Sequence, residues 1–122
     1  MQIELHTRRP FGAREEDVGG WHVVRVTGEV DAGTAGLLPT LVVYAVRRGA
    51  QHVCLDLSEL ERVDRSGAEA LRRCTSAARY AGGEVAMVAP ADPAVAEVLE
   101  DTGVSDEVPR LATPPRPRSA SR

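Results

Sequence analysis

Short apolar runs alternate with amphipathic stretches along most of the chain, and this alternation predicts an α/β domain. Residues 53–57 form a short, mostly apolar run, which is typical of a strand covered on both faces. Residues 21–27 and 84–89 predict two more strands. Apolar side chains recur every three or four positions over residues 37–46 and 67–80, which predicts two helices that each pack through one side.

The segments before the first helix predict an edge hairpin followed by a turn. Residues 2–6 alternate apolar and polar side chains, as expected for a half-exposed edge strand. Residues 8–20 hold proline and glycines among charges and predict a long, hairpin-like loop. Residues 28–31 predict a turn that closes the next strand, and either Asp31 or Thr34 is a plausible cap for the helix that follows.

The second half of the chain predicts a third helix and a last strand. Asp92 followed by Pro93 predicts the helix start, Gly103 predicts its end, and residues 108–111 predict an edge strand. The repeated strand–helix order implies a mixed but largely parallel sheet built from βαβ repeats, with right-handed crossovers. The Pro-, Arg- and Ser-rich end has little to bury. We therefore expect one domain over residues 1–111 and a disordered tail over 112–122.

Composition and charge narrow the function classes. No window approaches the 18 consecutive apolar residues of a membrane span, and the N-terminus lacks the apolar core of a signal peptide, so we expect a cytoplasmic protein with no membrane partner. Residues 1–108 carry a net charge of −7, whereas residues 109–122 carry +4. Neutralising phosphates needs a basic face, so the acidic folded part is not expected to bind nucleic acid.

The residue types that commonly carry catalysis or bind metals are scattered. Cys54 and Cys74 lack CxxC spacing and are expected to be small buried hydrophobes. His6, His22 and His52 lie near strand ends, where a solvated or hydrogen-bonded ring is expected more than a metal ligand. The chain has no glycine-rich phosphate loop, HExxH motif or nucleophile elbow. We therefore expect neither a cofactor nor an enzyme.

One serine, Ser66, stands where a loop meets a predicted helix. Glu69 follows it by three positions, the spacing of a capping box, in which the serine would be an ordinary N-cap contributing about 0.5–2 kcal/mol. The alternative is a phosphate acceptor. A phosphoryl group at a helix N-terminus meets unpaired N–H donors and the positive end of the helix dipole, so the helix could carry it without unfolding.

Four stretches together resemble the STAS domain of anti-sigma factor antagonists, and the resemblance spans roughly residues 3–111. The stretches are VVRVTGEVDAGTA (23–35), LDLSELERVDRSG (55–67), GGE (82–84) and VLEDTGVSDEV (98–108). The resemblance implies a STAS-like single domain that binds an anti-sigma factor, usually a serine kinase of the histidine-kinase-like ATPase fold, and so releases a sigma factor. In that family the kinase phosphorylates a serine at the start of the second helix, and a phosphatase reverses the reaction.

Ser66 falls on the phosphorylated position of that pattern, and Arg65 stands where the family often has a second serine. The arginine could pair with a phosphate on the next residue and help retain it, or it could alter the grip of the kinase on the loop. Asp64 would orient the loop through backbone hydrogen bonds, or it could be a plain Asx turn.

The partner-binding surface predicted from this resemblance combines two loops at the carboxyl end of the sheet. Its residues are Asp31, Thr34, Asp64, Arg65, Ser66, Gly67 and Glu69. Two alternatives stay open. One is an unphosphorylated STAS scaffold or docking subunit of a signalling or lipid-transport assembly. The other is an enzyme or small-ligand binder, which would need a pocket with convergent polar groups that the sequence does not reveal.

Overall fold

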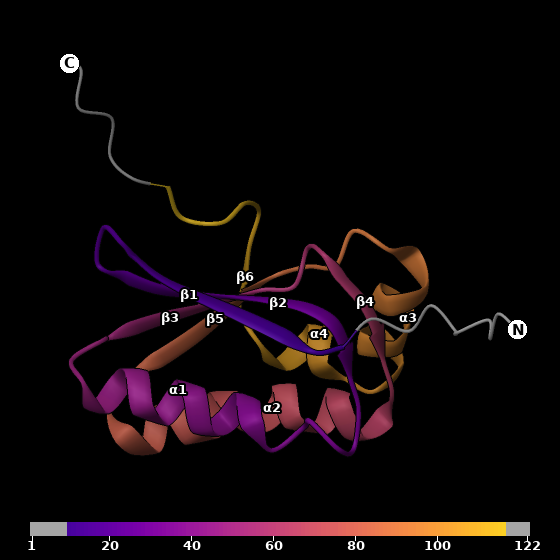
Figure 1. Cartoon of the computed structure of the whole chain (residues 1–122), viewed down its shortest axis with the longest axis horizontal. Helices are drawn as coiled ribbons and strands as arrows, with labels where there is room; N and C mark the ends of the chain where they lie inside the picture. The colour runs from indigo at the N-terminus through magenta and orange to yellow at the C-terminus, as the bar shows by residue number, and fades with distance from the viewer. Residues whose placement is uncertain (1–9, 117–122) are drawn as a thin grey trace, which may run out of the picture.

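The computed structural model describes residues 10–116 of the chain, so the strand predicted at residues 2–6 lies outside the described residues. The described part folds into one α/β unit (Figure 1). Its strands are β1 (Gly12–Val18), β2 (Trp21–Val30), β3 (His52–Asp56), β4 (Leu60–Val63), β5 (Glu84–Val88) and β6 (Arg110–Leu111). Its helices are α1 (Leu37–Arg47), α2 (Arg65–Ala81), α3 (Pro93–Asp101) and α4 (Val104–Glu107).

The sheet confirms the predicted architecture of a mixed, largely parallel sheet with an N-terminal edge hairpin. The strand order is β1-β2-β3-β5-β6, and β4 pairs with the second half of β2. Only the pair β1 and β2 is antiparallel within the described chain. Parallel pairing places the C-terminal ends of β2 and β4 at the same edge of the sheet, from which the chain enters α1 and α2 respectively.

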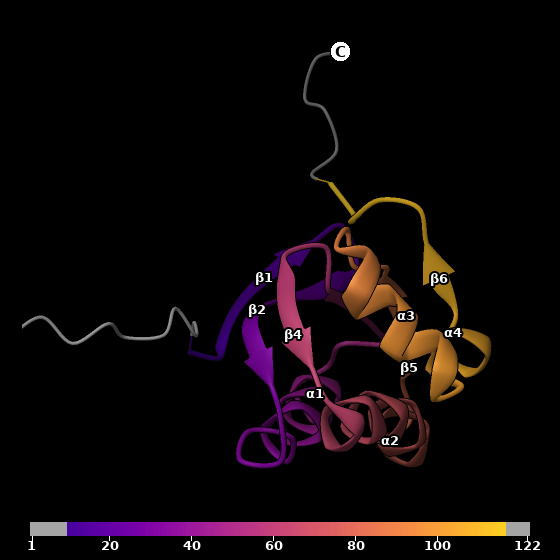
Figure 2. The same cartoon turned by 90° about the vertical axis from the view of Figure 1, so that its right-hand side faces the viewer.

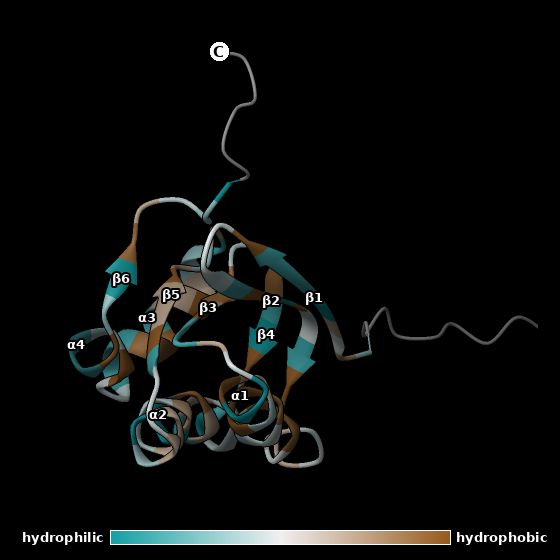
Figure 3. Ribbon diagram, turned by 90° about the vertical axis from the view of Figure 1, so that its left-hand side faces the viewer, coloured by the Kyte–Doolittle hydropathy of each residue, from teal (hydrophilic) through white to brown (hydrophobic). Residues whose placement is uncertain are grey.

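The main core lies between one face of the sheet and the helices. Helices α1 and α2 lie side by side on this face (Figure 1), and α3 and α4 extend the layer at one end (Figure 2). Coloured by hydropathy, β3 and β5 and the side of α1 toward them are largely apolar, whereas β2 mixes apolar and polar positions (Figure 3). The large side chains that this core excludes from solvent include Val24, Val26, Leu38, Val42, Val53, Leu55, Leu71, Met87 and Leu99.

The other face of the sheet carries a smaller apolar cluster and one partly buried ion pair. Val18, Val23, Cys54 and Val88 form the cluster, with Trp21 and Leu111 packed against it. Beside it, the Arg25 guanidinium lies 3.3 Å from the Asp56 carboxylate, which is only 1% exposed. Asp56 also accepts hydrogen bonds from the backbone N–H and the hydroxyl of Ser58, so the chain is fixed as it leaves β3.

The loop predicted over residues 8–20 contains strand β1, so that prediction was wrong. Four of the seven residues of β1 are exposed and most are charged, which hides the apolar alternation by which strands are recognised. Charged edge strands of this kind resist pairing with other chains. Gly19 and Gly20 form the two-residue hairpin turn, and both have positive φ (53° and 90°), which that turn type requires.

The turn predicted over residues 28–31 is also wrong, because β2 continues through Val30. Gly28 adopts a φ of 77° at a register shift, which lets the strand bend and pair with β4. Val63, which follows two charged residues in the sequence, ends β4 and pairs with Val30. The sequence hides β4 because its two central residues are exposed and charged.

The helix boundaries agree in part with the predictions. Helix α3 begins as predicted: Pro93 is its first residue, and the Asp92 side chain accepts a hydrogen bond from the backbone N–H of Ala94 at 2.8 Å. Helix α1 does not begin as predicted, because its N-cap is Gly36 and no side chain of the described residues caps it. The one-turn helix α4 had not been predicted. In the segment after β6, Pro114 and Pro115 are half-buried, and the domain boundary at residue 111 stays a prediction.

Candidate functional site

The start of α2 is capped by Asp64, two residues before the serine that the capping-box prediction chose. The Asp64 carboxylate accepts a hydrogen bond from the backbone N–H of Gly67 at 2.8 Å. Ser66 is therefore the second residue of the helix, and its exposed hydroxyl has no hydrogen-bond partner in the described chain. The capping box is wrong because Asp64 occupies the cap and Glu69 pairs with Arg72 instead.

Gly67 lets the first turn of α2 sit directly on the end of β2. A β-carbon at position 67 would collide with the Val30 carbonyl oxygen and come within 2.8 Å of the Val63 side chain. The backbone N–H of Asp64 donates to the same Val30 oxygen at 3.3 Å. The Ser-Gly pair thus has a physical reason: glycine permits the close approach, and the serine beside it points outward.

The loop between β2 and α1 is fixed by its own hydrogen bonds. The Asp31 carboxylate accepts from the backbone N–H groups of Gly33 (2.9 Å) and Thr34 (3.2 Å). The Thr34 hydroxyl accepts from the backbone N–H of Asp31 at 3.1 Å. Both polar side chains are therefore engaged within the turn. Their part in any surface is to shape the backbone, not to cap α1.

A shallow groove separates this loop from the first two turns of α2. Small residues form one wall, and the other wall combines a hydroxyl with charged side chains. The lining residues are Ala32, Ala35, Gly36, Arg65, Ser66, Glu69 and Arg73. Of the seven residues predicted to bind a partner, three line this groove, and the remaining four hold its walls in place from behind.

Arg73 lines the groove but was not among the site residues predicted from the sequence. It lies seven residues after Ser66, which is nearly two full helical turns, so both fall on one stripe of α2. The same spacing in the sequence could have identified it. Arg65 and Arg73 are both exposed, and neither has an ion-pair partner among residues 10–116.

Arg72, the residue before Arg73, is only partly exposed and is held by other parts of the chain. Its guanidinium lies 3.1 Å from the Glu69 carboxylate and 3.2 Å from that of Glu107, and it donates to the Thr102 carbonyl oxygen. Arg72 therefore ties α2 to the end of α3 and to α4. Because the Glu69 carboxylate is paired with Arg72, the positive charges of Arg65 and Arg73 have no carboxylate partner among residues 10–116.

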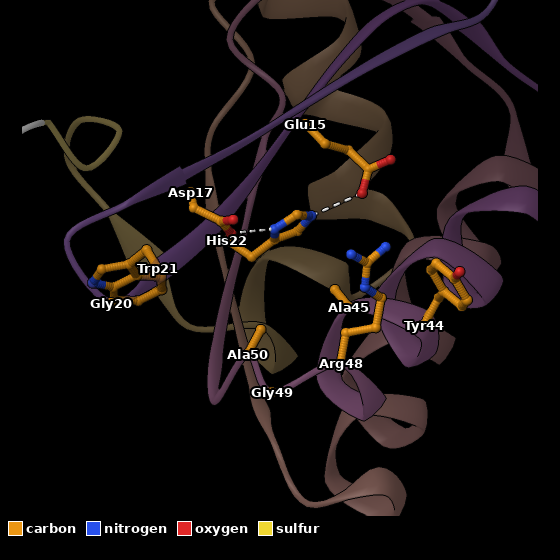
Figure 4. A pocket seen from close by; sticks show the side chains of 10 residues that line it. All are labelled: Glu15, Asp17, Gly20, Trp21, His22, Tyr44, Ala45, Arg48, Gly49 and Ala50. Atoms are coloured by element: carbon orange, nitrogen blue, oxygen red, sulfur yellow. Dashed lines mark hydrogen bonds and ion pairs between the residues drawn. The ribbon is translucent and has the colours of Figure 1, made fainter.

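A second cavity lies at the opposite end of the sheet, between the β1–β2 hairpin and the end of α1 (Figure 4). His22 lies between two carboxylates, with Nδ1 2.8 Å from Asp17 and Nε2 2.8 Å from Glu15. From α1, Arg48 stacks over Tyr44 at 5.4 Å and faces the same cavity (Figure 4). Sequence reasoning had expected a hydrogen-bonded or solvated His22, and the ring is hydrogen-bonded at both nitrogens.

The two carboxylates favour a charged His22. Ionised carboxylates only accept hydrogen bonds, so both ring nitrogens must donate, which requires the imidazolium form. Burial lowers the pKa of His22, but the hydrogen bonds and charges of Asp17 and Glu15 outweigh it, and the pKa lies above its usual 6.5. His22, Asp17 and Glu15 therefore link β1 to β2 electrostatically. Their charges and hydrogen bonds are matched within the group.

Cys54 and Cys74 are buried, as predicted, and burial raises the pKa of each thiol to about 12. Such thiols stay protonated and unreactive at neutral pH. Among residues 10–116, no cluster of three His, Cys, Asp or Glu side chains is placed to hold a metal ion. In the same range, none of the helices has the length and apolarity needed to cross a membrane.

Comparison with solved structures places the fold beside anti-sigma factor antagonists. An anti-sigma factor antagonist from Mycobacterium paratuberculosis superposes with a TM-score of 0.68 at 26% identity, covering 85% of this chain and 87% of that one. The anti-sigma factor antagonist SpoIIAA matches in its unphosphorylated form with a TM-score of 0.66 at 19% identity, over 83% of this chain and 89% of that one. The phosphorylated form of Bacillus SpoIIAA matches at 0.59 and 18% identity, over 83% and 92%.

Sequence comparison gives the family. No curated protein matches the chain in a sequence search. The family model of the STAS domain, however, matches residues 14–118, which is most of the chain and includes both walls of the groove. The chain therefore belongs to the STAS domain family.

Proposed function

We propose that this protein is an anti-sigma factor antagonist, which binds an anti-sigma factor and so frees a sigma factor for transcription. Family membership supports the general role, as does the fold shared with an anti-sigma factor antagonist at 26% identity. The observation that carries the proposal is the position of Ser66. Its hydroxyl, which has no partner within residues 10–116, lies on the exposed first turn of α2, in a groove shared with the β2–α1 loop.

The partner would dock on this groove and on the backbone that frames it. The docking residues are those predicted from the sequence, with Asp31, Thr34, Asp64 and Gly67 fixing the two walls and Arg65, Ser66 and Glu69 making contact. The proposed partner is an anti-sigma factor of the serine-kinase type, acting in the cytoplasm. The protein itself would act by binding, without catalysing a reaction.

Phosphorylation of Ser66 by that partner would reverse the interaction. A phosphoryl group adds about −1.5 to −2 charges and three strong acceptor oxygens. Because Asp64 holds the cap, the modification would leave the helix start intact and meet the favourable end of the α2 dipole. The added charge and its desolvation at the contact would weaken binding, and a serine phosphatase would restore the binding form.

Incubation of the full chain with ATP and each anti-sigma-type kinase of its own genome tests the proposal, with intact-mass and peptide analysis as the readout. We expect one kinase to add a single phosphoryl group at Ser66. Ser66→Ala should abolish the modification. The matched control is Ser76→Ala, which alters another exposed serine on the same helix and should change nothing.

Stable binding to an anti-sigma factor without any modification would assign the alternative function, an unswitched scaffold or docking subunit. Arg65, which replaces the second serine frequent in the family, is the residue that makes this alternative worth testing. Absence of both binding and modification with every candidate would contradict the proposed function.

A further inference from the structure

We propose that Arg65 and Arg73 form an intramolecular receptor for a phosphate on Ser66, an inference that rests on the phosphorylation proposed above. Both arginines line the same groove as the Ser66 hydroxyl. Neither is engaged elsewhere among residues 10–116, so no existing ion pair must break for them to turn toward a phosphate. The charges needed to hold the modified side chain are thus already in place before modification.

The helix geometry brings Arg73 within reach. Ser66 and Arg73 are separated by about 10.5 Å along the helix axis and lie on nearly the same side of it. Side chains on a helix lean toward its N-terminus, so the long arginine side chain extends back toward the serine. Arg65 adjoins the serine in sequence and lines the groove from the first turn, so the two guanidinium groups would approach the phosphate from both sides.

The carboxylates near the groove already have ion-pair or hydrogen-bond partners. Glu69 lies between Ser66 and Arg73 on the stripe, but its carboxylate is paired with Arg72 at 3.1 Å. The carboxylates of Asp31 and Asp64 accept backbone N–H groups in their own turns. The opposite wall consists of Ala32, Ala35 and Gly36, which carry no charge and leave space beside the serine.

Phosphorylation would change the charge of the groove and the availability of its arginines. Guanidinium groups bind phosphate through paired, charge-assisted hydrogen bonds. With both arginines on the phosphate, the modified groove is close to neutral, and the two cations are no longer free to contact a partner. Phosphorylation then acts by occupying the groove and its arginines, and the phosphoserine is sheltered on its own protein.

The test uses the full chain with phosphoserine placed at position 66 during synthesis, so that no kinase is required. Titration followed by phosphorus NMR gives the second pKa of the phosphate, which is ordinarily near 6. We expect it to lie lower in this chain, because cations favour the dianion. Arg73→Gln should raise it by roughly half a unit, the size of an exposed ion-pair contribution, and Arg65→Ser should act in the same direction.

The matched control is Arg79→Gln, an exposed arginine farther along the same helix that does not line the groove. Arg79→Gln removes one positive charge from the same helix, as Arg73→Gln does. It leaves the helix dipole unchanged and keeps both Arg65 and Arg73 in the groove. The shift should also shrink in about 1 M salt, where the Debye length is about 3 Å and exposed charges farther apart than this are largely screened. An equal pKa in the Arg73→Gln and Arg79→Gln proteins would overturn the receptor.

The two proposals can fail separately. If no anti-sigma factor binds or modifies the unmodified chain, the proposed function fails, and the NMR comparison still decides whether the arginines hold a phosphate. If Ser66 is a kinase substrate but its phosphate titrates independently of Arg73, the function stands and the receptor is wrong.

Discussion

Gly67 packs so closely against the carbonyl oxygen of Val30 that no side chain fits between the start of α2 and the end of β2. This contact sets the position of Ser66 relative to the β2–α1 loop, because the serine is the preceding residue and the loop begins one residue after Val30. The groove therefore depends on a backbone contact in the interior, although all of its charged side chains are on the surface.

Replacing Gly67 by alanine should destabilise the protein despite the better helix propensity of alanine. A β-carbon at position 67 would collide with a backbone oxygen, so we expect a cost in the upper part of the usual overpacking range of about 1–3 kcal/mol. That cost exceeds the gain of about 1 kcal/mol from propensity. Chemical denaturation measures the difference. Gly36→Ala serves as the control, since a β-carbon there meets no atom within 4 Å and Gly36 has an ordinary φ of −70°. Equal stability of Gly67→Ala and wild type would contradict the tight contact.

Because Asp64 and not Ser66 caps α2, the two residues should differ in their contribution to stability. Asp64→Ala should lower the free energy of unfolding by about 0.5–2 kcal/mol, because it removes the hydrogen bond to the Gly67 N–H. Ser66→Ala should change it by no more than about 0.5 kcal/mol, as for other exposed sites. Urea denaturation of the two variants in parallel decides the matter. A larger loss of unfolding free energy in Ser66→Ala than in Asp64→Ala would support the capping box instead.

Arg72 and Arg73 are adjacent on α2 but should differ in their effect on stability. Arg72→Ala removes the contacts to Glu69, Glu107 and the Thr102 carbonyl oxygen, and should cost about 1–2 kcal/mol. Arg73→Ala removes no interaction seen in the described chain and should stay within about 0.5 kcal/mol. Thermal or urea unfolding compares them, and similar losses would show that α4 does not depend on Arg72.

His22 should make stability depend on pH. Its pKa is raised in the folded state, so its contribution is fully present below about pH 6.5 and is lost as the pH rises through the folded pKa. Denaturation curves from pH 5.5 to 9 should show this loss in wild type. His22→Gln should flatten it. Glu16→Gln removes a carboxylate from β1, the strand that carries both His22 partners, but it does not contact His22 and should leave the slope unchanged. A slope in His22→Gln equal to that of wild type would contradict the imidazolium.

Much of the fold could be predicted from the sequence because the buried strands and helices carry strong periodic patterns. The apolar run at β3 indicates a buried strand, and the apolar spacing in α1 and α2 indicates amphipathic helices. Strands β1 and β4 could not be found in this way. Their exposed residues are charged, and each is recognisable as a strand only through its pairing with β2.

The candidate site was predicted in outline but not in detail. The two loops were expected at one end of the sheet, and the structure brings them together at Ser66. The cap was misplaced because Ser-x-x-Glu and Asp-x-x-Gly overlap within six residues, and only the contact with Val30 selects the second. The engagement of Arg72 depends on α4, which lies far along the chain and had not been predicted.

The most direct test of the proposed function is the affinity of the identified anti-sigma factor for the chain with and without phosphate on Ser66. Titration calorimetry would compare wild type, Ser66→Ala, Ser76→Ala and the protein with phosphoserine at position 66. We expect wild type and Ser76→Ala to bind alike and Ser66→Ala to bind within a few-fold of them, since it removes only one hydroxyl from the contact. The phosphorylated form should bind at least about tenfold more weakly, which is about 1.4 kcal/mol. Equal affinity of the phosphorylated and unmodified proteins would contradict a switch at Ser66.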